Sequence, residues 1–292
     1  MRILLTGGNG FIGKALIKKI SKNHQVLSLV RKRNKKKQHN VNEIEVNLKN
    51  IILIESDILK FAPDCCIHLA WEGLPNYSLE ACHSNIDICL SLLEVIIRTK
   101  IPRVFFAGTC WEYGSKTGPQ IEMNVPELTS LFALTKRFIF SFLETLSLEN
   151  KIEYRWGRIF FVYGPGQRKT SLLPSLWDQY KRSEILSVRE PNAIQDFIHI
   201  DDLVTGIELL STLDIPSGPY NLGSGNATLV GQFANIVSKN LNLNGAYEKI
   251  TKISSSGMWA NMDLTFDRTG WKPTISINDG IAKSLEFYRN SP

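Results

Sequence analysis

The first sixty residues consist of short apolar runs separated by one amphipathic run. The runs "RILLT" and "QVLSLV" predict strands, because each is short, apolar and bounded by polar or glycine residues. Between them, "FIGKALIKKISKN" repeats its apolar residues at helical spacing, and glycines separate it from the first strand. This order of strand, glycine turn, helix and strand predicts a βαβ unit with parallel strands.

The same alternation continues along the chain. Further buried strands are expected at "CCIHLA", "RVFFAG" and "YRWGRIFFV", a third strand is expected to end at Asp57 in "ESDI", and helices are expected over residues 79–99 and 130–149. From about residue 164 the predicted elements become shorter. We therefore predict an α/β fold with a Rossmann-type doubly wound parallel sheet over residues 1–163. A smaller, mostly helical substrate lobe follows over residues 164–292, with some segments returning to the sheet.

The glycine turn indicates a dinucleotide. Gly8, Gly10 and Gly13 fit G-x-G-x-x-G, and Gly7, Gly10 and Gly13 fit the wider G-x-x-G-x-x-G. Glycines at these positions let a pyrophosphate approach the backbone at the amino terminus of the helix, and they let the helix pack on the strand. Because the flanking strand and helix are both predicted, the motif has its proper structural context.

The end of the second strand indicates which dinucleotide is bound. A site for NAD usually has an acid about 20 residues after the glycines, but the sequence has none between Gly13 and Glu43. The strand runs instead into Arg31, Lys32 and Arg33, whose charges suit a 2′-phosphate. We therefore expect NADP(H), with Asp57 as a candidate for the adenine edge.

Composition narrows the class of protein. The chain has 292 residues, is 43% hydrophobic and 21% charged, and carries a net charge of +6, which is ordinary for a globular protein. No apolar run approaches the roughly 18 residues of a membrane helix, and glycines interrupt the first apolar run too early for a signal peptide. Five cysteines without C-x-x-C spacing indicate a reducing cytoplasm, with no disulfide framework and no metal site. The basic run over residues 31–37 lacks interleaved aromatic residues, so we expect no nucleic-acid partner.

Together these features resemble the extended short-chain dehydrogenase/reductase family of nucleotide-sugar epimerases, dehydratases and ketoreductases, over nearly the whole chain. "TGGNGFIG" resembles its cofactor turn, "HLAW" its H-L-A-A strand end, "QDFIHIDDL" its R-D-F-I-H-V-x-D segment and "YNLGSG" its Y-N-x-G-x-G. "GTCWEYG" resembles S-S-x-x-V-Y-G, which places Thr109 on the catalytic Ser/Thr. "LFALTK" resembles Y-x-x-x-K, which places Lys136 on the lysine and Phe132 on the tyrosine.

The phenylalanine matters because of the chemistry that the resemblance implies. In the family, the tyrosine phenol protonates the oxygen of a ketone that accepts hydride, and the lysine holds the nicotinamide ribose. Phe132 keeps the ring and lacks the acid. Three explanations stay open: the chain is a deliberate Tyr→Phe variant, it uses another proton donor, or it is a relative that only binds NADP(H). Cys110, Glu112 and Tyr113 are the nearest candidates for another donor.

The resemblance implies a reaction and a set of contacts. The expected reaction is the NADPH-dependent reduction of the 4-keto group of a dTDP- or CDP-linked 4-keto-6-deoxyhexose, in deoxysugar synthesis for surface polysaccharide such as the O-antigen of lipopolysaccharide. A nucleotide-sugar epimerase and a non-catalytic NADP(H)-binding regulator are the alternatives. Gln195 replaces the arginine of R-D-F-I-H, which weakens any prediction of a diphosphate contact there. A homodimer is expected through a four-helix bundle of the helices over residues 79–99 and 130–149.

The predicted site residues fall into three groups. Catalytic positions are Thr109, Phe132, Lys136, Glu112 and Cys110. Cofactor contacts are Gly7, Gly10, Phe11, Ile12, Gly13, Arg31, Asp57, Ile58, Leu69, Ala70, Lys136 and Phe160. Substrate contacts are Trp71, Tyr113, Phe161, Gln167 and Leu172.

Overall fold

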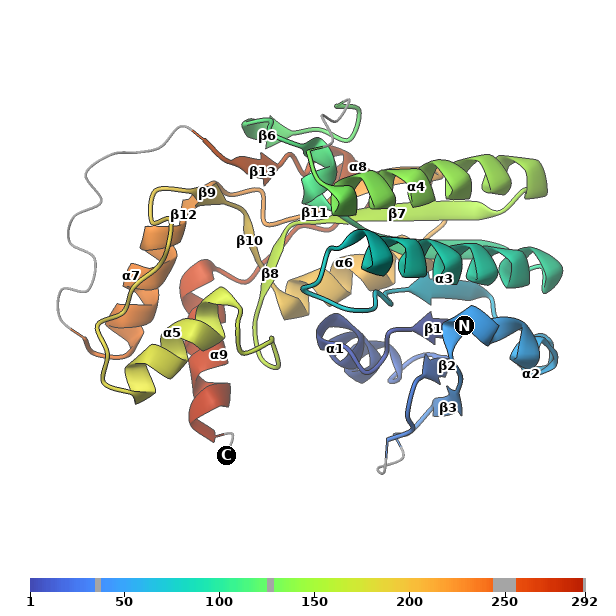
Figure 1. Cartoon of the computed structure of the whole chain (residues 1–292), viewed down its shortest axis with the longest axis horizontal. Helices are drawn as coiled ribbons and strands as arrows, with labels where there is room; N and C mark the ends of the chain where they lie inside the picture. The colour runs from blue at the N-terminus through green and yellow to red at the C-terminus, as the bar shows by residue number, and fades with distance from the viewer. Residues whose placement is uncertain (35–37, 125–128, 244–255, 291–292) are drawn as a thin grey trace. The chain divides into compact units, whose positions relative to one another are not determined.

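The computed structural model describes residues 1–34, 38–124, 129–243 and 256–290 (Figure 1). The chain divides into two compact units. Unit 1 comprises Met1–Ser115, Val125–Arg158 and Val204–Tyr220, and unit 2 comprises Lys116–Asn124, Ile159–Leu203 and Asn221–Pro292. The sequence predicted one boundary after residue 163 with later segments returning to the sheet; the observed units interleave at more places, since a short segment before residue 125 also belongs to unit 2.

A seven-stranded sheet with the order β11-β7-β5-β4-β1-β2-β3 forms the centre of unit 1. Its strands are β1 (Arg2–Thr6), β2 (Gln25–Val30), β3 (Val41–Glu45), β4 (Cys65–His68), β5 (Arg103–Thr109), β7 (Glu153–Ile159) and β11 (Gly218–Leu222). The pairs β1–β2, β2–β3, β1–β4 and β4–β5 are parallel. The predicted Rossmann-type α/β fold is confirmed.

The helices of unit 1 bury the sheet because the strands are apolar along nearly their whole length. These helices are α1 (Phe11–Ile20), α2 (Glu55–Phe61), α3 (Leu79–Arg98), α4 (Leu131–Asn150) and α6 (Ile200–Thr212), of which α6 begins in unit 2. Leu4, Cys66 and Phe106 of the strands share one core with Leu92 of α3 and Phe140 of α4. Burying each large apolar side chain contributes about 1.5–3 kcal/mol, so this core holds α3 and α4 on the sheet.

Serine caps set where α3 and α4 begin. The Ser78 hydroxyl accepts the backbone N–H of Ala81 at 3.3 Å, and the Ser130 hydroxyl accepts that of Ala133 at 3.2 Å. Both serines have extended backbone and satisfy one of the free N–H groups of the first turn. The cap at Ser130 therefore places the "LFALTK" motif in the first two turns of α4.

The expected third strand ending at Asp57 is wrong. Residues Leu48–Ile54 form the 3-10 helix η1 and residues Glu55–Phe61 form α2, whereas β3 lies earlier, at Val41–Glu45. The apolar residues of this stretch recur every three or four positions, so Leu48 and Ile58 are buried on one side. The four consecutive apolar residues "IILI" hid that helical spacing.

The described part of unit 2 contains short helices and three two-stranded sheets. Its helices are α5 (Leu172–Lys181), α7 (Val230–Asn240), α8 (Asp263–Thr269) and α9 (Ile277–Asn290). Strand β10 (Phe197–His199) pairs with β8 (Phe161–Tyr163), β12 (Thr228–Leu229) with β9 (Ile194–Gln195), and β13 (Met258–Ala260) with β6 (Gly118–Gln120). Asp196, between β9 and β10, accepts the backbone N–H groups of Ser224, Gly225 and Ala260 at 2.6, 3.0 and 3.0 Å. Its buried carboxylate thus ties these segments together.

Candidate active site

The glycine turn between β1 and α1 has a geometry that side chains would block. A Cβ atom at Gly13 would lie 2.1 Å from the carbonyl oxygen of Gly7. Gly7 has a φ of +76°, and a Cβ atom there would lie 2.7 Å from the backbone nitrogen of Ala70 and 2.8 Å from the carbonyl carbon of Leu69. The turn therefore lies directly against the end of β4, and the predicted residues Gly7, Gly13, Leu69 and Ala70 come together.

The amino terminus of α1 is suited to hold a phosphate. Gly10 is its N-cap and has no side chain to cap the helix, and the first turn contains no acidic residue. The N–H groups of Phe11 and Ile12 thus belong to the free donors of the helix start, where the helix dipole favours an anion. These features fit a dinucleotide cofactor.

Cations follow β2 at the carboxyl edge of the sheet. Arg31, Lys32 and Arg33 are exposed, and among the described residues no carboxylate pairs with their side chains. The backbone of this segment is anchored instead: the Asn9 amide donates to the carbonyl of Lys32 at 3.0 Å, and Asn34 N–H donates to Glu43 at 2.7 Å. The predicted Lys35–Lys37 part of the basic run lies outside the described residues.

Asp57 and Ile58 do not lie where the cofactor prediction needs them. Asp57 is exposed on α2, and Ile58 is wholly buried in the core. Asn47 comes just after the carboxyl end of β3, and its side chain accepts the N–H of Lys49 at 3.1 Å. Since ligands bind beyond the carboxyl ends of such strands, Asn47 is a candidate for the adenine edge that the sequence did not indicate. The alternating run "VNEIE" was the signal for β3.

Thr109 and Lys136 lie at the carboxyl end of β5. Thr109 is the last residue of the strand, and its hydroxyl accepts the N–H of Trp111 at 3.3 Å. The Lys136 ammonium donates to the carbonyl of Ala107 at 2.7 Å and lies 4.5 Å from the centre of the Trp71 ring. Burial lowers the pKa of Lys136, although nearby groups including Glu112 oppose the shift.

Phe132 is packed among aromatic rings, which we call the aromatic cluster: Trp71, Tyr77, Trp111 and Phe132. The centre of the Phe132 ring lies 4.8 Å from that of Trp71 and 5.6 Å from that of Trp111, both edge to face. It lies 4.8 Å from the centre of the Tyr77 ring, with a tilted geometry. Only 9% of Phe132 is exposed. The aromatic cluster thus surrounds the position where the resemblance expects a phenol.

Glu112 is held as a buried acceptor. Its carboxylate accepts the N–H of Thr109 at 2.9 Å, the indole N–H of Trp156 at 2.9 Å and the Arg158 Nε–H at 3.1 Å. Neither side chain of the Glu112–Arg158 ion pair is more than 2% exposed. Protonating the carboxylate would weaken a buried ion pair and three hydrogen bonds that the carboxylate accepts, which argues against Glu112 as the proton donor.

The other two candidate donors are also buried. Tyr113 is 0% exposed, and its hydroxyl accepts the Arg158 Nη1–H at 3.1 Å. Cys110 is 2% exposed and lies in the short 3-10 helix η2 (Cys110–Tyr113) that Thr109 caps. Both residues belong to the packing behind the end of β5, so neither is well placed to exchange protons with solvent.

The remaining predicted residues belong to unit 2. Phe160 is buried, and its N–H donates to the carbonyl of Leu222 at 3.0 Å. Phe161 is half-buried on β8, and the Gln167 amide donates to the carbonyl of Val162 at 2.8 Å. Their assignments to cofactor and substrate stay predictions.

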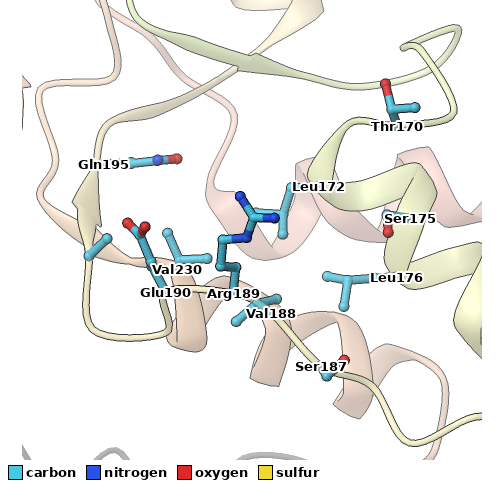
Figure 2. A pocket seen from close by; sticks show the side chains of 11 residues that line it. Thr170, Leu172, Ser175, Leu176, Ser187, Val188, Arg189, Glu190, Gln195 and Val230 are labelled. Carbon is cyan, nitrogen blue, oxygen red and sulfur yellow. The ribbon is translucent and has the colours of Figure 1, made fainter.

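Unit 2 contains a pocket of about 320 Å³ (Figure 2). Leu172, Ser175 and Leu176 of α5 line one side, and residues 187–190 line another. Figure 2 shows the Arg189 side chain in the middle of the lining residues, with Gln195 of β9 at the left and Ser175 of α5 at the right. Of the predicted substrate residues, the pocket therefore includes Leu172.

Some kinds of site are not formed by the described residues. Among them, no group of three or more His, Cys, Asp or Glu side chains could hold a metal ion. None of the helices they form is long and apolar enough to cross a membrane.

The fold and the glycine turn define a Rossmann-type protein that is suited to a dinucleotide. Residues 3–223 match the NAD dependent epimerase/dehydratase family, and the chain belongs to this family. It is 25% identical to Protein CapI of Staphylococcus aureus, over 99% of this chain and 98% of that protein. The same figures apply to the ADP-L-glycero-D-manno-heptose-6-epimerase of Brachyspira hyodysenteriae. The solved structure of the UDP-glucose 4-epimerase of Thermotoga maritima with UDP-glucose is 22% identical, covers 99% of both chains and has a TM-score of 0.86.

Proposed function

We propose that this protein reduces the 4-keto group of a 4-keto-6-deoxyhexose carried on dTDP or CDP, with NADPH as the reductant. The observation that carries the proposal is the end of β2, where exposed cations stand in place of an acid. These cations suit NADPH, and a reductase consumes one NADPH in each catalytic cycle and then replaces it. The names of the relatives support a nucleotide sugar as the substrate class.

Unit 1 would hold the cofactor. The free N–H groups at the start of α1 would bind its pyrophosphate, and Arg31 would bind the 2′-phosphate. When bound, NADPH supplies the hydride. The Thr109 hydroxyl already accepts one N–H, so its own hydrogen is available to hold the keto oxygen of the substrate. The buried Lys136 ammonium adds a positive charge beside this position.

Unit 2 would bind the nucleotide. The pocket beside α5 combines apolar side chains with the hydroxyls of Ser175 and Ser187 and the guanidinium of Arg189. Among the described residues Arg189 has no ion-pair partner. Gln195, which replaces the family's arginine, lines the same pocket. Arg189 can therefore supply the charge for a diphosphate that Gln195 lacks.

The test follows NADPH absorbance with dTDP- and CDP-4-keto-6-deoxyhexoses. One NADPH oxidised per sugar reduced supports the proposal. Calorimetry with dTDP, CDP, UDP and GDP identifies the base, and Arg189→Gln should weaken nucleotide binding by roughly ten-fold or more, because a charged hydrogen bond is worth about 1.5–3 kcal/mol. Arg182→Gln, outside the pocket, is the matched control and should bind like the parent.

An epimerase is the second candidate, because relatives such as the heptose-6-epimerase and the solved UDP-glucose 4-epimerase carry that name. Such an enzyme would interconvert two sugar nucleotides with no net loss of NADPH, which the same assay detects. NADPH binding without turnover of any sugar would instead support a regulator that only binds the cofactor.

We also propose a homodimer through α3 and α4, which pack against each other in unit 1. α4 exposes an apolar stripe at intervals of three or four residues: Leu131, Leu134, Phe138 and Phe142 are 46, 51, 40 and 40% exposed. A second copy that presents the same stripe would bury these side chains in a four-helix bundle.

A further inference from the structure

The aromatic cluster contains one acidic hydroxyl. Phe132 has none, and the indoles of Trp71 and Trp111 are not acids at physiological pH. The fourth ring is Tyr77, whose centre lies 4.8 Å from the centre of Phe132 and 5.5 Å from that of Trp111. A phenol is therefore present beside the position where the family's tyrosine is missing.

We propose that Tyr77 is the proton donor that replaces the absent tyrosine at position 132. The inference rests on the proposed reductase function and names the acid that it needs. Tyr77 is half-buried, and among the described residues its hydroxyl has no hydrogen-bond partner. Its O–H is thus free to donate to a ligand and open to exchange with water, unlike the buried Tyr113.

The loop between β4 and α3 holds Tyr77 in place. Asn76 N–H donates to the carbonyl of Gly73 at 2.7 Å, and the Asn76 side chain accepts the N–H of Ser78 at 2.9 Å. Ser78 in turn caps α3. The residues on both sides of Tyr77 are therefore anchored, which limits the motion of a group that must meet a substrate oxygen.

A positive charge borders the same cluster. The Lys136 ammonium lies 4.5 Å from the centre of the Trp71 ring and 5.9 Å from that of Phe132. Lys136 thus contacts two rings of the aromatic cluster, and one of them, Phe132, contacts Tyr77.

Tyr77 supplies the proton that completes the proposed reduction. The carbonyl carbon accepts a hydride from the reduced nicotinamide cofactor, and the π electron pair of the C=O bond moves to oxygen. That oxygen forms a bond to the phenolic proton of Tyr77, whose O–H bond breaks. The phenolate then takes a proton from water, which reaches the half-exposed side chain.

The decisive variant is Tyr77→Phe, which removes only the phenolic oxygen atom. Turnover should fall by roughly 10²–10⁴, the usual cost of losing a positioned acid. NADPH and nucleotide affinities, measured by calorimetry, should stay within two-fold of the parent. Tyr180→Phe is the control, because Tyr180 is also half-buried, its hydroxyl has no partner among the described residues, and it lies outside the pocket lining.

A swap of the phenol completes the test. Adding Phe132→Tyr to Tyr77→Phe should restore turnover at least ten-fold, because the acid returns to the same cluster. If Tyr77→Phe turns over like the parent, or if the swap restores nothing, Tyr77 is not the donor, while the proposed function stands. If the parent binds NADPH but reduces no keto sugar, both proposals fail.

Discussion

Replacing Glu112 by glutamine tests the role that the structure gives to this carboxylate. Glu112→Gln keeps the shape of the side chain and removes its charge. Arg158, whose side chain is 2% exposed, then loses its ion-pair partner at 3.1 Å. Breaking a buried ion pair from one side typically costs about 3–5 kcal/mol. We expect the free energy of unfolding to fall by up to that amount.

Urea titration monitored by tryptophan fluorescence measures this change. The midpoint of unfolding should shift to lower urea, and the dependence of the free energy of unfolding on urea should stay the same. Glu94→Gln is the control, because Glu94 forms an exposed pair with Arg98 at 3.8 Å, and such pairs contribute about 0–1 kcal/mol. In the double variant with Arg158→Met, the loss should be smaller than the sum of the two single losses, because the two side chains interact directly.

The opposite result would refute the structural role. If Glu112→Gln unfolds like the parent, still binds NADPH and loses turnover, the carboxylate acts in the chemistry. Glu112 would then return as a proton donor, and the inference about Tyr77 would lose its main argument by exclusion.

Three further predictions concern other parts of the chain. Arg31→Ala should weaken NADPH binding roughly ten-fold or more and leave NADH binding unchanged, as titration of both cofactors would reveal; equal affinities of the parent for both would contradict NADP(H) specificity. Phe138→Glu with Phe142→Glu should convert a dimer to a monomer in analytical ultracentrifugation, whereas Phe287→Glu, 43% exposed on α9, should not; a monomeric parent would contradict the dimer. Burial lowers the pKa of His68 to about 3, so the unfolded chain binds a proton that the folded one does not, and stability should fall by about 1.4 kcal/mol per pH unit from this group as pH drops from about 6.5 toward 3. The difference in the free energy of unfolding between pH 7 and pH 5, measured by urea titration, should be smaller for His68→Gln than for the parent. An equal difference would count against the lowered pKa of His68.

The amino-acid sequence determined the features that depend on neighbouring residues. Apolar runs and helical spacing predicted the βαβ unit, and the glycines predicted a turn that only residues without a Cβ atom can form. The prediction from local pattern failed before Asp57, where the four consecutive apolar residues 51–54 concealed the helical spacing of this stretch.

Only the tertiary structure decided which side chains meet across the chain. The sequence placed Glu112 among the candidate acids, and its pairing with Arg158, 46 positions away, made it a buried acceptor. Tyr77 drew no attention in the sequence, because nothing near it in the chain indicates chemistry. It contacts Phe132 because the β4–α3 loop and the start of α4 pack together in unit 1. Burial and long-range contacts set whether a group can hold or give up a proton, and these depend on packing between segments that no local pattern encodes.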